Sequence, residues 1–145
     1  MAPISVWGPA LWKVLHGIGF GTGIASPVML RDVTREYVWL MNNIETIIPC
    51  VHCVVHVREF KKDHPSPAGF DGGFWLWELH ESVNKKLGLM GIPYSPEIGS
   101  GTNVAESWKI YKNILRDSLI ASHVSGASVK DYGRHLGLWS GFLCI

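Results

Sequence analysis

Apolar residues recur at helical spacing along most of the chain, and no segment shows the strict alternation of a half-buried strand. In the first of these segments, Leu11, Leu15 and Ile18 form a single stripe. A Trp-Gly-Pro sequence at 7–9 suits the first turn of a helix, because the missing N–H of proline costs no hydrogen bond there. The pattern predicts one helix that ends at the glycine-rich residues 17–23, which are interpreted as a flexible turn.

The same period predicts further helices downstream, separated by loops rich in helix breakers. Pro49 stops the apolar pattern that precedes it and is well placed to open the helix that follows. Proline and glycine cluster in residues 63–69 and 88–101, which are therefore predicted as loops. The predicted helices run from about Leu30 to Ile48, Cys50 to Lys62, Phe74 to Leu87 and Asn103 to Ser122.

The signal in the final residues, 123–145, is weaker. Ser128 to Asp131 resembles a capping box, which indicates the start of one short helix. Together the elements predict an all-α fold, a small helical bundle in which neighbours joined by short loops are antiparallel.

Composition supports one folded domain. The chain has 145 residues, 47% of them hydrophobic and 17% charged, which is enough apolar surface to offset the entropy of ordering. Thirteen Lys and Arg against twelve Asp and Glu give a net charge of +1, which argues against a nucleic-acid-binding surface. Lys13 and His16 interrupt the N-terminal apolar stretch, so neither a membrane span nor a secretory leader is expected. We expect a soluble protein made in the cytosol.

Two of the three cysteines, Cys50 and Cys53, stand at the predicted start of a helix. Unpaired N–H groups and the positive end of the helix dipole stabilise a thiolate there, and the thiolate is the form that carries out disulfide exchange. The two intervening residues let the sulfurs close into a disulfide. The spacing therefore favours a redox-active pair.

Other interpretations of the pair stay open. Cys50, Cys53, His56 and His64 could be assembled as zinc ligands, although their spacing matches no finger pattern. Two buried thiols could also pack as small hydrophobic groups. Val54 stands where haem attachment requires a histidine, and a thioredoxin-like motif should follow a strand, so both of those are disfavoured.

Two histidines, His16 and His80, sit among apolar residues at helical spacing. Trp12 lies four residues before the first, and Asn84 lies four residues after the second. A single histidine in such a place is most often a core residue, but the two with these neighbours suggest a wall for an aromatic, polar ligand. The glycine run at 17–23 is not a dinucleotide fingerprint, because no predicted strand precedes it.

Four short segments, in this order, resemble the Erv/ALR flavin-linked sulfhydryl oxidases, particularly their small viral members. The first is similar to the family's opening Trp-x-x-x-His helix, and the second is a Cys-x-x-Cys-x-x-His sequence after a proline. The later two are similar to the family's His-Asn-x-Val-Asn-x-x-Leu sequence and to a segment whose tryptophan packs beside the flavin's adenine. The segments span residues 7–16, 50–56, 80–88 and 104–108.

The resemblance implies non-covalent FAD at the centre of the bundle, and it implies no metal site. By matching position, Cys50 is expected to be the outer sulfur that substrate attacks and Cys53 the sulfur beside the flavin. Lys86 is expected near the pyrophosphate, and Trp108 is expected against the adenine. The implied cofactor-binding residues are Gly8, Trp12, His16, Cys53, His56, His80, Val83, Asn84, Lys86, Leu87 and Trp108.

The resemblance also implies an architecture and an activity. The fold is expected to be a four-helix bundle with an additional short helix, in residues 1–122. Residues 109–145 match nothing in the family, and residues 123–145 are expected to form a C-terminal extension. The activity is expected to be oxidation of protein dithiols to disulfides, with electrons passing from Cys50 and Cys53 to FAD and then to O2, giving H2O2. The family resemblance also implies a homodimer. The viral likeness implies viral protein substrates and a location in the host cytoplasm at virus assembly sites or in the virion.

The chain departs from the family pattern in several places. Glu81 stands where the family usually has asparagine, Ile48 replaces an aromatic residue, and the link at 88–103 is longer than usual. Cys144 stands alone near the end of the chain, so it is interpreted as an unpaired thiol in preference to a shuttle or an intermolecular disulfide. The rival functions are a zinc-binding interaction module and a flavin-free thiol-exchange protein, and the colour of the purified protein separates them from the oxidase.

Overall fold

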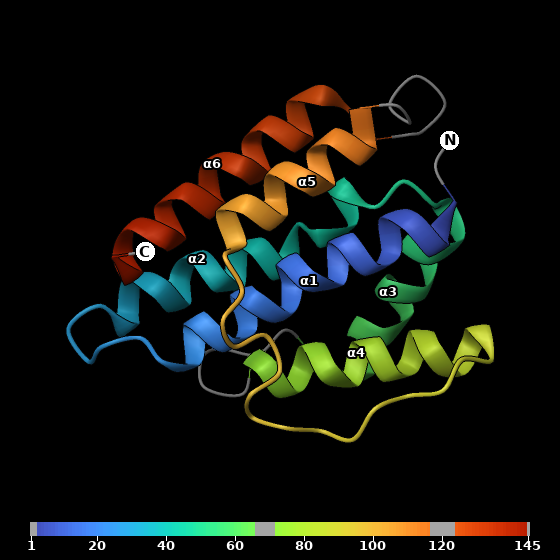
Figure 1. The fold of residues 1–145 in the computed structure, drawn as a ribbon, viewed down its shortest axis with the longest axis horizontal. Coiled ribbons are helices and arrows are strands. Elements are labelled where there is room, and N and C mark those ends of the chain that lie inside the picture. Colours follow the sequence, from blue (N-terminus) through green and yellow to red (C-terminus); the bar gives the residue numbers. More distant parts are fainter. Residues whose placement is uncertain (1–2, 66–71, 117–123, 145) are drawn as a thin grey trace.

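The computed structural model describes residues 3–65, 72–116 and 124–144, and every regular element in those ranges is a helix (Figure 1). The all-α class predicted from the periodicity is therefore confirmed. A short 3-10 helix, η1, joins the second and third α-helices. The elements are α1 (Ile4–Gly23), α2 (Leu30–Asn42), η1 (Ile44–Ile47), α3 (Val51–Asp63), α4 (Gly72–Leu87), α5 (Val104–Arg116) and α6 (Gly126–Leu143).

The helix α1 lies in the middle of the molecule and packs against α2, α4 and α5 (Figure 1). On one side α6 packs on α2 and α5, and on the other side α3 packs on α4. The connection between α4 and α5 runs back along α4 and then crosses α1 (Figure 1). At the crossing Gly99 has a φ of +89°, and a Cβ there would lie 2.0 Å from the carbonyl oxygen of His16, so only glycine fits.

Buried tyrosines tie the helices together through their hydroxyl groups. Each hydroxyl donates a hydrogen bond to a backbone carbonyl of another element, so no phenol oxygen of the three is left unpaired in the core. The ties are Tyr37 to Gly72 (3.0 Å), Tyr111 to Ile47 (2.6 Å) and Tyr132 to Leu40 (2.9 Å).

The prediction that the first helix ends at the glycine run is wrong, because α1 continues through all of residues 17–23. The glycines are sites of close helix contact. A Cβ on Gly17 would lie 2.7 Å from Val104 of α5, and one on Gly19 would lie 3.0 Å from the Cα of Gly73 in α4. Periodicity could not reveal this, because a glycine that breaks an isolated helix also permits the closest approach of a neighbour.

Most of the other boundaries agree with prediction to within a few residues. The predicted helix from Leu30 to Ile48 is divided into α2 and η1. Cys50 is the N-cap residue of α3, and α4 and α5 begin within two residues of the predicted positions. Residues 89–103 contain no helix, as predicted, while the predicted end of the fifth helix lies outside the described residues.

The helix α6 is longer than predicted and begins earlier. Its N-cap is Ser125, whose hydroxyl oxygen accepts a hydrogen bond from the N–H of Ser128 at 3.0 Å, so the capping box predicted to start at Ser128 is wrong. Trp139 is fully buried, and its indole N–H donates to Thr22 of α1 at 3.0 Å. The helix therefore packs into the same core as the rest of the bundle. No helix in the described ranges is long and apolar enough to cross a membrane.

Candidate active site

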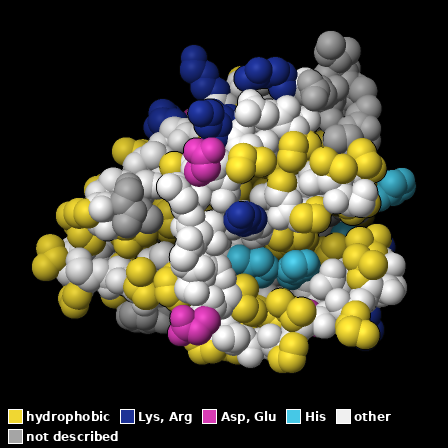
Figure 2. Space-filling model, in the orientation of Figure 1, with side chains coloured by type: hydrophobic (Ala, Val, Ile, Leu, Met, Phe, Trp, Pro, Cys, Tyr) yellow, Lys and Arg dark blue, Asp and Glu magenta, His cyan; other side chains and the backbone are white. Residues whose placement is uncertain are grey.

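A cavity of about 880 Å³ opens between α1, α3 and α4, within the size range of small-molecule and cofactor sites. Figure 2 shows histidine side chains gathered on this face of the molecule, with hydrophobic side chains around them. The structure brings most of the predicted site residues to this one cavity. Those that line it are Gly8, Trp12, Cys50, Cys53, His56, His80, Val83, Asn84, Lys86 and Leu87.

The cysteine pair lies at the junction of this cavity and the start of α3. Cys50 caps the helix, and its sulfur accepts a hydrogen bond from the backbone N–H of Cys53 at 3.3 Å. Both cysteines are free thiols and both are half-buried. The two residues lie one helical turn apart at the cavity wall, with the Cys50 side chain folded back towards Cys53, and this placement suits a reversible disulfide.

Burial opposes ionisation of the inner sulfur. Desolvation raises the pKa of Cys53 to about 12, and the hydrogen bond and charge of Cys50 act in the same direction, while the nearby ammonium of Lys86 lowers it. The expectation that the helix N-terminus stabilises a thiolate therefore does not hold for Cys53. Desolvation is the largest cause, and with Cys50 it outweighs the lowering of the pKa by Lys86 and by a backbone hydrogen bond.

An aromatic cluster forms the α1 and α4 side of the cavity. The indole of Trp12 stacks on the imidazole of His80, with ring centroids 4.0 Å apart and planes 9° apart. The Nε2 of His16 lies 2.9 Å from the Nδ1 of His80, and the two nitrogens share a hydrogen bond. Trp12 and His80 make a flat wall at the cavity, and His16 is hydrogen-bonded to His80.

The histidines of the cluster are held in the neutral form. Burial, with a further contribution from His80, lowers the pKa of His16 to about 4, and burial also lowers the pKa of His80. The Nδ1 of His16 is buried and has no hydrogen-bond partner. A buried polar atom of this kind is costly unless a ligand satisfies it, so it marks a binding position.

A second hydrogen bond, between α3 and α4, supports the cysteine pair. The Nε2 of His56 lies 2.8 Å from the hydroxyl of Ser82, and His56 lies one turn after Cys53 on α3. Burial lowers the pKa of His56, and the charge of Lys86 acts in the same direction. The hydrogen bond between His56 and Ser82 therefore fixes α3 against α4, and it holds a neutral imidazole at the cavity.

Two predicted site residues lie elsewhere. His16 does not itself line the cavity and reaches it only through Trp12 and His80. Trp108 is buried between α5 and α6, with its ring centroid 5.5 Å from that of Tyr132, and does not line the cavity. The helix α6 packs against this indole, and the sequence predicted only a short helix there, without its contacts.

Sequence reasoning missed the apolar side chains that form much of the cavity wall. They come from the stripe of α1 that was assigned to the core, from η1, α3 and α4, and from the link after α4. Helical spacing marks such residues as buried but does not distinguish a core contact from a cavity wall. The missed residues include Leu11, Leu15, Ile44, Val57, Leu79 and Leu89.

The structure also bears on the zinc alternative. Within the described ranges, no group of three or more His, Cys, Asp or Glu side chains could hold a metal ion.

The third cysteine, Cys144, ends α6 in a left-handed conformation, with a φ of +61°, and its side chain is exposed. It lies on a different helix from the Cys50–Cys53 pair.

The residues present fit the FAD that the resemblance implies. The cavity has mainly apolar walls and a flat aromatic face, which suit a flavin ring. Lys86, which lines the cavity, supplies a cation that suits a pyrophosphate.

Comparison with known proteins gives a family and two informative relatives. The Erv1 / Alr family model matches residues 9–109. An FAD-linked sulfhydryl oxidase of African swine fever virus (isolate Pig/Kenya/KEN-50/1950) is 25% identical over 138 residues, which cover 92% of this chain and 96% of that protein. The FAD-linked sulfhydryl oxidase ERV1 of Arabidopsis thaliana is 30% identical over 88 residues, 59% of this chain and 44% of that protein. No solved structure gives a significant match.

Proposed function

This chain belongs to the Erv1/Alr family, and we propose that Cys50 and Cys53 are its reactive pair, with Cys50 attacked by substrate and Cys53 facing the cofactor. The activity is that of an FAD-linked sulfhydryl oxidase, which converts protein dithiols to disulfides. The observation that carries the assignment is the Cys-x-x-Cys start of α3 at the wall of the apolar cavity.

The different surroundings of the two sulfurs support their order. The ammonium of Lys86 on α4 lowers the pKa of Cys53, and the charge of Cys53 contributes to the raised pKa of the buried Tyr111 on α5, which supports an inward-facing Cys53. Cys50 stands one turn earlier, at the capping position, where the helix begins. An incoming thiolate therefore meets Cys50 first.

The exchange chemistry follows from that order. A substrate thiolate attacks the sulfur of Cys50 in the oxidised pair, the Cys50–Cys53 bond breaks, and Cys53 leaves as a thiolate. The second substrate thiolate then attacks the substrate sulfur of the mixed disulfide, which releases Cys50 and the substrate disulfide. Two electrons have moved from the substrate to the pair. The cavity residues beside Cys53 would hold FAD, and the bound cofactor would supply an acceptor for this electron pair and its transfer to O2, giving H2O2.

The protein's own contribution is electrostatic and positional. The ammonium of Lys86 lowers the pKa of Cys53, so it stabilises the thiolate that the first exchange step releases. The neutral imidazoles of His16 and His80 present hydrogen-bonding nitrogens without adding a positive charge. The hydrogen bond between His56 and Ser82 keeps α3 in place during the exchange.

We also propose viral protein substrates, a homodimer, and action in the host cytoplasm at virus assembly sites or in the virion. The support is the similarity to the African swine fever virus oxidase over 92% of this chain. Disulfides persist poorly in a reducing cytosol, so an oxidase there makes sense for a virus that needs disulfide-bonded proteins.

The test of the proposed function uses the purified protein. We expect a yellow preparation with a flavin absorption band, and oxygen uptake when a dithiol is added. A colourless preparation that releases zinc would instead identify a zinc module, and a colourless, metal-free one would leave thiol exchange without flavin. Sedimentation tests the dimer, and non-reducing electrophoresis of wild type against Cys144→Ser tests whether Cys144 links two copies.

A further inference from the structure

The link between α4 and α5 is attached to α4 by two side chains that have no role in the proposed chemistry. Trp77 and Glu81 lie one turn apart on the same face of α4. The indole N–H of Trp77 donates to the carbonyl oxygen of Ile92 at 2.8 Å. The backbone N–H of Ile92 donates to the carboxylate of Glu81 at 3.0 Å. One turn of helix therefore holds both polar backbone groups of a single link residue.

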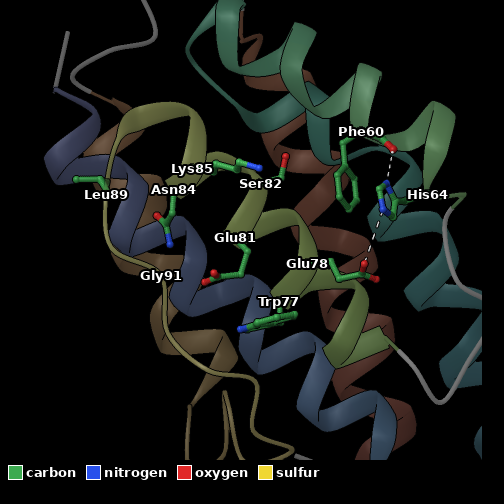
Figure 3. Close-up of a pocket in the computed structure, with 10 residues that line it drawn as sticks. All are labelled: Phe60, His64, Trp77, Glu78, Glu81, Ser82, Asn84, Lys85, Leu89 and Gly91. Carbon is green, nitrogen blue, oxygen red and sulfur yellow. Dashed lines mark hydrogen bonds and ion pairs between the residues drawn. The ribbon is translucent and has the colours of Figure 1, made fainter.

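The link passes very close to this pair. Figure 3 shows Trp77 and Glu81 extending from α4 towards the part of the link that carries Gly91. A Cβ on Gly91 would lie 2.0 Å from a carboxylate oxygen of Glu81, so glycine at this position is what lets the carboxylate reach the N–H of Ile92.

The start of the link is held as well. Gly88 ends α4 with a φ of +71°, and the N–H of Leu89 donates to the carbonyl oxygen of Asn84 at 2.8 Å. Residues 89–92 are thus attached to α4 at both ends. They form a short strap, in which Met90 and Gly91 lie between the two fixed residues, Leu89 and Ile92.

One residue of the strap, Leu89, is part of the wall of the active-site cavity. Leu89 lines the cavity of about 880 Å³, and it also lines a second cavity of about 590 Å³ on the other side of α4, the one drawn in Figure 3. Glu81 and Trp77 line only the second cavity. The carboxylate that replaces the family's asparagine therefore contacts the strap and not the proposed flavin site.

We propose that Trp77 and Glu81 are positioning residues that hold the strap, residues 89–92, as a wall of the cofactor cavity and thereby slow the release of bound FAD. This inference rests on the proposed function, because it requires FAD in that cavity. The proposal explains three features that have no role in the catalytic chemistry: Glu81, Trp77 and the long link.

The main test compares rates of FAD release from the holoprotein, followed by flavin fluorescence after dilution. We expect Glu81→Ala to release FAD about fivefold faster than wild type, the factor expected for one lost hydrogen bond to a partly exposed backbone N–H. Glu81→Gln keeps an acceptor oxygen and should restore slow release. Glu78→Ala is the matched control, because Glu78 is another carboxylate of α4 whose ion-pair partner is His64 at 3.7 Å.

The outcomes distinguish a failure of the proposed function from a failure of the strap proposal. Wild-type protein that retains no FAD overturns the proposed function and this inference with it. Wild type that retains FAD, with Glu81→Ala releasing it at the wild-type rate, overturns the strap and leaves the oxidase assignment standing. An equal acceleration in Glu78→Ala also overturns the strap, because it would show a general effect of charge on α4.

A second variant and a second readout cover the case in which Glu81→Ala does not fold. Trp77→Phe removes the indole N–H but keeps an aromatic ring beside Phe74 and Tyr94. We expect faster FAD release in this variant too, and faster hydrogen exchange at the amide of Leu89 or Ile92. Unchanged release together with unchanged exchange overturns the proposal.

Discussion

At the scale of single residues, burial decides the chemistry more than the local sequence does. The helix N-terminus at Cys50 and Cys53 suggests two stabilised thiolates, but the apolar cavity raises the pKa of Cys53. The same burial keeps His16 neutral and leaves its Nδ1 without a partner. Both effects come from residues distant in the sequence. Because burial disfavours the thiolate of Cys53, that thiolate depends on the nearby ammonium of Lys86 for stabilisation.

The two cysteines should respond differently to substitution. Cys53→Ser should abolish oxygen uptake with dithiothreitol, while its Cys50 still forms a mixed disulfide with oxidised glutathione. Cys50→Ser should also lose turnover, and its Cys53 should react far more slowly, because the raised pKa leaves little thiolate. Oxygen consumption and intact-protein mass measure the two properties. Normal turnover of dithiothreitol by Cys53→Ser contradicts the assignment.

The stability of the flavin-stripped protein should depend on His16 in acid. The pKa of His16 is about 4 in the fold against 6.5 when unperturbed, so the unfolded state binds the proton more tightly. Stability should therefore fall as the pH drops from 6.5 to about 4, by about 3 kcal/mol at most from this group.

Urea unfolding across that pH range measures the slope. His16→Gln should be less sensitive to acid than wild type, because glutamine does not titrate. Equal slopes in the two proteins would show that His16 does not titrate differently on folding.

At the scale of elements, the first helix shows how tertiary contacts reverse a local preference. Residues 17–23 contain four glycines, and the sequence predicts a turn there. They nevertheless continue α1, because three other helices lie against them. Gly17 faces α5, Gly19 faces α4 and Gly21 faces α6. The helical packing of these neighbours compensates for the poor helix propensity of glycine.

Glycines in this run should therefore differ sharply in their tolerance of alanine. A Cβ on Gly21 would lie 2.6 Å from the ring of Trp139, whereas Gly23 has nothing within 4 Å. We expect Gly21→Ala to destabilise the protein by about 1–3 kcal/mol through overpacking. Gly23→Ala should be neutral or stabilising, because alanine is the better helix former. Thermal unfolding of both variants tests this, and equal effects would contradict the close contact with α6.

At the scale of the whole molecule, α6 joins the bundle instead of forming an appendage. Tyr132, Leu136 and Trp139 belong to the continuous core, and the carboxylate of Glu36 on α2 lies 2.6 Å from the Nδ1 of His135 on α6. The indole of Trp39 stacks on that imidazole, with centroids 3.5 Å apart. The helix therefore shares both apolar and polar contacts with the oxidase bundle.

Truncation of the α6 core should affect the entire molecule. We expect Trp139→Ala to lower the free energy of unfolding by about 3–5 kcal/mol, within a single transition that includes the cavity helices. Leu138→Ala is the control, since Leu138 is 42% exposed and its loss should cost little. Urea unfolding followed by far-UV circular dichroism distinguishes the outcomes. Loss of α6 alone, with the rest unaffected, would support an independent extension at 123–145.

Much of the fold and most of the candidate site could be predicted from the sequence. Apolar periodicity located the helices, and the motifs placed Trp12, Cys53, His80 and Lys86 in one site before any contact was known. Trp108 was placed beside the cofactor by its motif alone, and the structure instead covers it with α6. A motif carries the residue type and spacing, but it does not carry the neighbours that a helix elsewhere in the chain supplies.

The sequence by itself determined the helical class, the proposed reactive pair and the aromatic residues of the candidate site, because these depend on spacing within one helix. Only the tertiary structure decided that the glycine run is helical, that the inner thiol is hard to ionise, and that Glu81 binds the link. Those outcomes depend on which groups meet across helices, and desolvation and close packing are properties of the assembled bundle.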